Sequence, residues 1–164
     1  MPTLVARIAL AGAKEEVSAA RRKVVDQVRA WGVPLDDETT DVIRLIASEL
    51  ITNAVVHGQG AVTIWLYHRP GRLVIEVLDI NANAPLMSCA GETDEGGRGL
   101  ALVDFFAVRS GWQPVEDGKR VWAEVAIPRP VPSMRVAVLR KFFTARSNPN
   151  VSASSFQQLT LAVA

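Results

Sequence analysis

Residues 49–58, ELITNAVVHG, are the stretch from which the fold and function of this chain are inferred. Glu49, Asn53 and His57 follow one another at intervals of four residues, so a helix places them in a line along one side. The residues between them are mostly apolar, which is typical of a helix that packs against a core. The stretch therefore predicts a helix with a carboxylate, an amide and an imidazole on or beside its buried face.

This polar line has two interpretations. A buried carboxylate without partners costs on the order of several kcal/mol, so Glu49 and Asn53 either satisfy backbone groups at the edge of a sheet or take part in chemistry. For chemistry, the amide oxygen of Asn53 suits Mg²⁺, and the carboxylate of Glu49 accepts a proton or orients an attacking hydroxyl. His57 precedes Gly58, a helix-ending residue, and is equally suited to interact with the dipole at the helix C-terminus.

Periodicity on both sides of this stretch predicts a chain of alternating helices and strands. The predicted elements are a strand at 3–10, helices at 14–31 and 38–57, strands at 61–68 and 72–79, a helix entered through 95–107, and a closing hairpin at 106–113 and 119–127. Asp36 or Asp37 is placed to cap the helix at 38–57. Residues 80–98 show little periodicity, and a loop of this length inside a compact domain is usually functional or disordered.

Composition narrows the class of protein. The 164 residues are 49% hydrophobic, which suggests one domain with a sizeable core. The 18 basic and 17 acidic residues leave a formal charge of +1, which gives no general attraction to nucleic acid or to a membrane surface. Cys89 is the single cysteine, so an intrachain disulfide and a cysteine-based metal site are excluded, and a reducing cytoplasm fits.

Membrane and export signals are weak in the sequence. No stretch approaches the roughly 20 apolar residues that are needed to cross a bilayer. The short apolar run near the N-terminus has no basic segment before it and is followed at once by charged residues. We therefore interpret it as an edge strand, with a cleaved signal as the alternative.

Two further segments carry groups that suit a nucleotide. Gly96, Gly97 and Gly99 stand at the start of a helix, where glycines let the backbone approach an anion and N–H groups point toward it, and Arg98 adds a charged fork. The same turn is equally explained as a flexible hinge, and it is not a Walker A loop because no Gly-Lys-Ser/Thr follows. Asp79, the last residue of a predicted strand, either starts a turn or accepts a hydrogen bond from an adenine amino group.

Taken together and in this order, these stretches resemble the GHKL ATPase superfamily, which includes histidine kinases, type II topoisomerases and a heat-shock chaperone. Within it they are similar to the bacterial anti-sigma factor serine kinases. ELITNAVVHG resembles the N-box, LDINANAP (78–85) stands in place of the first glycine box, EGGRGLALV (95–103) resembles the second, and GKRVWAEVAIP (118–128) resembles the last strand. The resemblance covers about residues 1–128 and implies a Bergerat-type ATP-binding fold. That fold is an α/β protein of the α+β two-layer sandwich type, with a mixed, mostly antiparallel sheet and helices on one face.

The resemblance also implies roles for single residues. Glu49 would be the base or orienting carboxylate of phosphoryl transfer, Asn53 would bind Mg²⁺, and Asp79 would contact adenine. With ATP and Mg²⁺ as cofactors, the implied cofactor-binding residues are Asn53, His57, Asp79, Asn81, Asn83, Gly97, Arg98, Gly99 and Leu100. Residues 80–98 would form the ATP lid.

The sequence departs from the family pattern at two places. The first glycine box normally reads Asp-x-Gly-x-Gly, but Asn81 and Asn83 replace its glycines. Asparagine tolerates left-handed backbone geometry, which would preserve the turn, while its side chains would crowd a nucleotide lying against the backbone. The family often has a threonine near the last strand that helps to hold adenine, and Lys119 is present instead. We expect ATP binding to be retained, but weakened or altered.

The function that the resemblance implies is that of an ATP-dependent serine/threonine protein kinase acting as an anti-sigma factor. Such a protein holds a sigma factor and phosphorylates a serine on a small antagonist protein. The alternative is a non-catalytic module that sequesters a partner and uses nucleotide as a structural ligand, or binds none. We expect a cytoplasmic protein without a direct nucleic-acid partner, and the edge of the first strand could support a homodimer.

Residues 129–164 are predicted to form a C-terminal extension that begins within the PRPVP segment at 128–132. Basic and apolar residues at 133–147 indicate an amphipathic helix, which packs on the domain, lies in a solvated tail, or contacts a membrane or another protein. The last residues, 148–164, have the composition of a loosely held tail.

Overall fold

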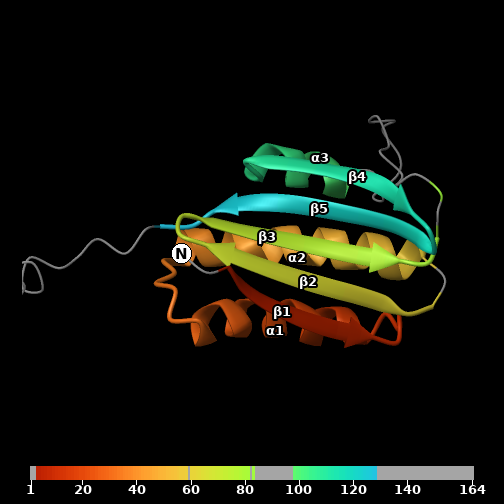
Figure 1. Cartoon of the computed structure of the whole chain (residues 1–164), viewed down its shortest axis with the longest axis horizontal. Helices are drawn as coiled ribbons and strands as arrows, with labels where there is room; N and C mark the ends of the chain where they lie inside the picture. Colours follow the sequence, from red (N-terminus) through yellow and green to blue (C-terminus); the bar gives the residue numbers. More distant parts are fainter. Residues whose placement is uncertain (1–2, 59, 82, 84–97, 129–164) are drawn as a thin grey trace, which may run out of the picture. The chain divides into compact units, whose positions relative to one another are not determined.

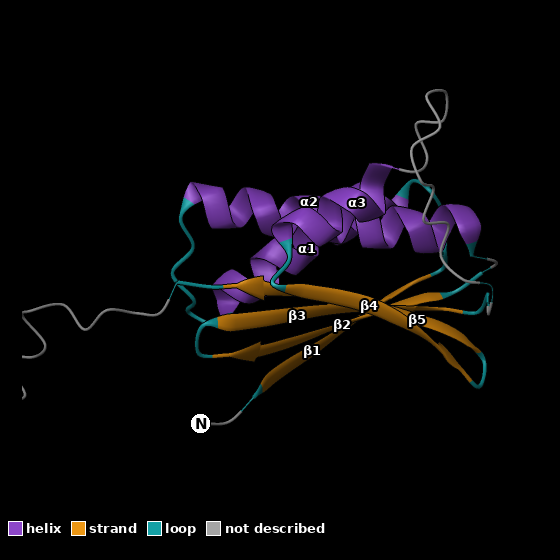
Figure 2. Cartoon of the chain, turned by 90° about the horizontal axis from the view of Figure 1, so that it is seen from above, coloured by secondary structure: helices purple, strands orange, loops and turns teal. Residues whose placement is uncertain are grey.

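The chain folds into two layers, a five-stranded sheet and a layer of helices that covers one of its faces (Figure 2). A computed structural model describes residues 3–58, 60–81, 83 and 98–128. The predicted α+β sandwich with helices on one face is confirmed. Every described strand pair is antiparallel, so this part of the chain shows no parallel component of the expected mixed sheet.

The helices and strands follow the predicted order, and their bounds differ from the prediction by three residues or fewer. They are β1 (Leu4–Leu10), α1 (Glu16–Ala30), α2 (Asp37–His57), β2 (Val62–Arg69), β3 (Arg72–Asp79), α3 (Arg98–Phe106), β4 (Arg109–Val115) and β5 (Gly118–Ala126). The strand order in the sheet is β1-β2-β3-β5-β4 (Figure 1). The end of β3 and the start of β5 are therefore neighbours, although α3 and β4 separate them in the sequence.

α2 begins at a side-chain cap. Asp36 accepts a hydrogen bond from the N–H of Thr39 at 2.7 Å, so of the two predicted caps the helix uses Asp36. Hydrogen bonds from Thr39 hold the pKa of the Asp36 carboxyl below its ordinary value. The cap therefore stabilises α2 above the ordinary pKa of the carboxyl, and this stabilisation is lost as the pH falls through the lowered value.

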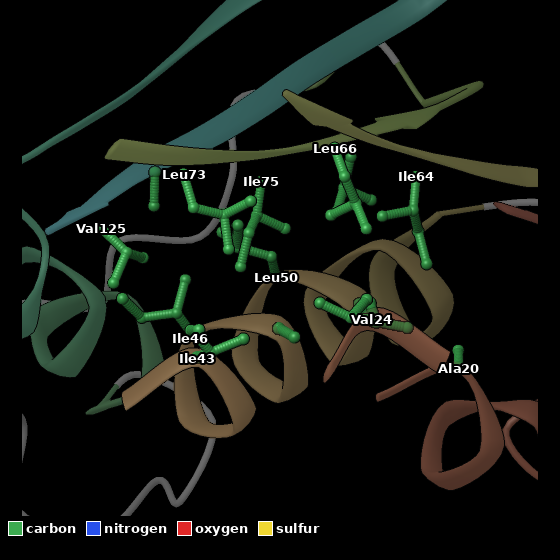
Figure 3. Close-up of a cluster of buried hydrophobic side chains, with 14 of the residues drawn as sticks. Ala20, Val24, Ile43, Ile46, Leu50, Ile64, Leu66, Leu73, Ile75 and Val125 are labelled. Carbon is green, nitrogen blue, oxygen red and sulfur yellow. The ribbon is translucent and has the colours of Figure 1, made fainter. Parts of the chain in front are cut away.

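The core lies between α2 and the inner face of the sheet. Alternate side chains of β2 and β3 point toward the helices, as the two-residue period of a strand requires. Figure 3 shows Ile46 and Leu50 of α2 facing Leu66, Leu73 and Ile75 of the sheet, and all five side chains are fully buried. Each such side chain contributes roughly 1.5–3 kcal/mol on burial, so this contact fixes which side of α2 faces inward.

β1 lies at the edge of the described sheet and pairs only with β2 there. The prediction of a first strand is confirmed, and Leu4 and Val5 at its start are exposed. A homodimer through this edge remains a prediction. None of the described helices combines the length and the apolar character that crossing a membrane requires.

Several predicted segments lie outside the described residues. They include residues 129–164, the proposed extension, and residues 84–97, which make up most of the predicted lid. The domain boundary after residue 128 and the roles of these segments stay predictions.

The first testable prediction concerns the packing of α2. We expect Ile46→Ala to lower the free energy of unfolding by about 2–5 kcal/mol, because Ile46 is fully buried against the sheet and its loss leaves a cavity. Val56→Ala on the same helix is the control, since Val56 is 46% exposed and its truncation should change stability by less than about 1 kcal/mol. Urea denaturation measures both values, and equal losses would contradict this packing.

Candidate functional site

The C-terminal half of α2, the end of β3 and the start of α3 meet in the described structure. Gly99 at the start of α3 lies against the carboxylate of Glu49 on α2. Asn81, just after β3, donates a hydrogen bond from its side-chain amide to the carbonyl oxygen of His57 at 2.5 Å. The residues of the ELITNAVVHG stretch thus have neighbours from two distant parts of the chain.

Glu49 is half-buried at the border of the core stripe, beside the first turn of α3. A methyl group added at Gly99 would overlap the Oε2 atom of Glu49, so any larger residue at this position would force the carboxylate to move. The first N–H groups of a helix have no partner within the helix and carry a partial positive charge. The carboxylate of Glu49 therefore lies beside backbone N–H groups that favour an anion.

Asn53 lies one turn after Glu49 and is also half-buried. Its Nδ2 atom is buried and has no hydrogen-bond partner among the described residues. Buried polar groups in folded proteins are nearly always satisfied, and an exception often marks a ligand. This observation favours a ligand at Asn53 over the interpretation that its amide satisfies the backbone of the sheet.

The loop after β3 is held by side-chain hydrogen bonds. Oδ1 of Asp79 accepts a bond from the N–H of Asn81 at 2.8 Å, and Oδ1 of Asn81 accepts one from the N–H of Asn83 at 3.0 Å. The tolerance of asparagine for left-handed geometry is not used here, because no described residue other than glycine has a positive φ. Asn81, which stands in place of a glycine of the motif, holds the turn through its side-chain hydrogen bond to the backbone. The side-chain amide of Asn81 also donates a hydrogen bond to the carbonyl oxygen of His57 at the end of α2.

Asp79 and Lys119 form a buried ion pair. The two residues lie directly opposite each other on β3 and β5, both side chains are 1% exposed, and Nζ of Lys119 lies 3.4 Å from Oδ2 of Asp79. Oδ2 accepts no hydrogen bond within the described part of the chain. At Gly118, with φ of 146°, an added methyl group would overlap the carbonyl oxygen of Asp79, so β5 begins in close contact with the end of β3.

Sequence reasoning noted Lys119 as a departure from the family but missed its pairing with Asp79. A signal for the pairing is present in the sequence, because Asp79 and Lys119 carry opposite charges at the ends of two strands that were expected to share a sheet. The pairing needs the register of β3 against β5, which neither strand reveals alone.

The other predicted residues are placed less completely. Leu100 is half-buried and packs against the core, and Asn83 is exposed. Gly97 lies outside the described residues, and only the backbone of Arg98 is described, as the first residue of α3. His57 is half-buried in the last turn of α2, which is compatible with both of its interpretations.

The contact between Gly99 and Glu49 generates the second prediction. In the wild type, Gly99→Ala forces the carboxylate of Glu49 to move. In a Glu49→Ala background the added methyl group has room, so the higher helix propensity of alanine stabilises α3 without a clash. We expect a coupling free energy of about 0.5–3 kcal/mol in a double-mutant cycle on stability. Effects that add to within about 0.3 kcal/mol would contradict the contact.

Comparison with known proteins agrees with the fold and with these motifs. Residues 10–124 match the family model of the histidine kinase-like ATPase domain, a range that contains α2, the end of β3 and α3. A search of curated proteins found no match. The family match supports ATP binding by this domain. The chain belongs to the histidine kinase-like ATPase domain family.

Proposed function

We propose that the chain is an ATP-dependent serine/threonine protein kinase that acts as an anti-sigma factor. It holds a sigma factor and transfers the γ-phosphoryl group of ATP to a serine on an antagonist protein. The observation that carries the proposal is the position of the Glu49 carboxylate beside the start of α3. Family membership supports ATP as the phosphoryl donor, and the resemblance of the motifs to those of anti-sigma factor kinases supports the acceptor and the partners.

Glu49 and the backbone at the start of α3 have different roles in phosphoryl transfer. Glu49 takes the proton from the serine hydroxyl or orients that hydroxyl. The serine oxygen bonds to the γ-phosphorus while the bond between the γ-phosphorus and ADP breaks. The backbone N–H groups at the start of α3 stabilise charge on the phosphate oxygens. Phosphoryl transfer depends mainly on such positioning and charge stabilisation, so these few groups suffice.

Asn53 is the residue that fits a magnesium ion. Its side chain is half-buried one turn after Glu49, and an amide oxygen is a suitable ligand for a hard cation. The atom without a partner among the described residues is the nitrogen Nδ2, a donor that suits a phosphate oxygen rather than the ion itself. Nowhere in the described part of the chain do three His, Cys, Asp or Glu side chains gather to hold a metal. The ion would therefore be held jointly by Asn53 and the phosphates, whose negative charge it would neutralise.

The second candidate is a module that sequesters a partner and uses nucleotide only as a structural ligand. The altered first glycine box favours it, because Asn81 and Asn83 stand where the family has glycines. Both candidates sequester a protein partner in the cytoplasm, which is a sigma factor in the first. Both also allow a homodimer through β1, whose outer edge has no neighbour in the described sheet.

Asn53→Ala tests the nucleotide site. We expect calorimetry to show Mg²⁺-dependent ATP binding by the wild type and a loss of at least about tenfold in affinity in the variant, because one hydrogen bond or ligand to a charged group contributes about 1.5–3 kcal/mol. Thr52→Ala, the preceding half-buried residue on α2, is the control and should bind ATP like the wild type. A well-folded wild type that binds no ATP would refute both candidates that use nucleotide.

Glu49→Gln tests the kinase directly. We expect transfer from labelled ATP to candidate antagonist proteins to fall by about 10²–10⁴-fold while ATP affinity changes little, because the amide cannot take a proton. Glu38→Gln, an exposed glutamate at the other end of α2, should leave transfer unchanged. Undiminished transfer by Glu49→Gln would rule out the proposed role of Glu49. ATP binding without any transfer by the wild type would favour the second candidate.

A further inference from the structure

The ion pair between Asp79 and Lys119 is the one feature of the site that the proposed function leaves unexplained. A buried charge is strongly destabilising unless it is paired, so two side chains that are each 1% exposed hold one another in place. Their strand positions are directly opposite in the register of β3 and β5. The ammonium is therefore a fixed part of the surroundings of Asp79.

Asp79 has a single oxygen left for a ligand. Oδ1 already accepts the hydrogen bond from the N–H of Asn81, at 2.8 Å. Oδ2 is buried, accepts no hydrogen bond within the described residues, and faces Nζ of Lys119 at 3.4 Å. A ligand that reaches this position therefore meets one acceptor and one charged donor side by side.

We propose that Lys119 is the residue that sets base specificity, and that it makes the site accept 6-oxopurine nucleotides as well as adenine nucleotides. This inference rests on the proposed nucleotide-binding function and deepens it. A lone carboxylate accepts the 6-amino group of adenine and repels the 6-carbonyl oxygen of guanine or hypoxanthine, since both would be acceptors. The ammonium of Lys119 supplies the donor that the carbonyl needs.

The edges of the two kinds of purine fit the pair in different ways. A 6-oxopurine places its carbonyl oxygen at the ammonium and its N1–H at Oδ2, which satisfies both protein groups. Adenine places its amino group at Oδ2 and its N1 acceptor at the ammonium. The ammonium bonds to either edge, but without it a 6-oxopurine leaves its carbonyl oxygen unpaired beside the carboxylate, whereas adenine keeps its amino group on Oδ2. The gain from Lys119 is therefore larger for the 6-oxopurine.

Calorimetry with ATP and inosine triphosphate tests the proposal. The two nucleotides differ only at positions 1 and 6 of the base, so the ratio of their dissociation constants reports on the contacts assigned to Asp79 and Lys119. For the wild type we expect the two constants to agree to within about tenfold. Lys119→Met removes the donor. In this variant we expect the affinity for inosine triphosphate to fall at least about tenfold relative to the affinity for ATP, because one polar contact of this kind contributes about that much to binding.

Two further variants make the test decisive. Arg120→Met removes the neighbouring cation of β5, which pairs with Glu76 at 3.4 Å, and should leave the ratio unchanged. If Lys119→Met does not fold because Asp79 is left unpaired, Lys119→Gln keeps a neutral donor, and its ratio should move in the same direction by at least about threefold.

Each outcome separates this inference from the proposed function. A wild type that prefers ATP by more than about 100-fold, or a ratio that the Lys119 variants leave unchanged, overturns the role of Lys119 and leaves ATP binding intact. A wild type that binds neither nucleotide overturns the proposed function, and the inference with it.

Discussion

The packing of α2 across the inner face of the sheet is the contact on which the other features of this structure depend. Ile46 and Leu50 are fully buried against β2 and β3, so the rotation of the helix about its own axis is fixed. Residues beside that stripe, Glu49 and Asn53, must then lie at its border, half-buried. Successive residues of a helix are about 100° apart, so a different rotation of α2 about its axis would bury the Glu49 carboxylate completely or point it into the solvent. The core itself positions the site.

The two parts of the site are built by different means. At the start of α3 a missing side chain, that of Gly99, makes room for the carboxylate of Glu49. At the end of β3 added side chains hold the structure, because Asn81 bonds to the loop and to α2, and Lys119 pairs with Asp79. The first part suits phosphate chemistry, and the second is the part that we propose to contact the base.

The sequence predicted most of the fold because the burial patterns are regular. Residues of β2 and β3 alternate between buried and half-buried along nearly their whole length, and such alternation is visible without a structure. The pairing of Asp79 with Lys119 was not predicted, since it depends on a strand register that no local pattern encodes. The sequence also did not show that the turn after β3 forms at negative φ, with Oδ1 of Asn81 accepting a hydrogen bond from the N–H of Asn83. The roles assigned to Gly97 and Arg98 remain predictions.

An NMR titration of the labelled protein with Mg–ATP tests whether nucleotide binds where α2, the end of β3 and the start of α3 meet. We expect the amide signals that shift on titration to belong to residues 49–57, 79–81 and the first turn of α3. Signals that shift only on the opposite face of the sheet, around Trp65 and Tyr67, would contradict it, as would no shift at saturating nucleotide.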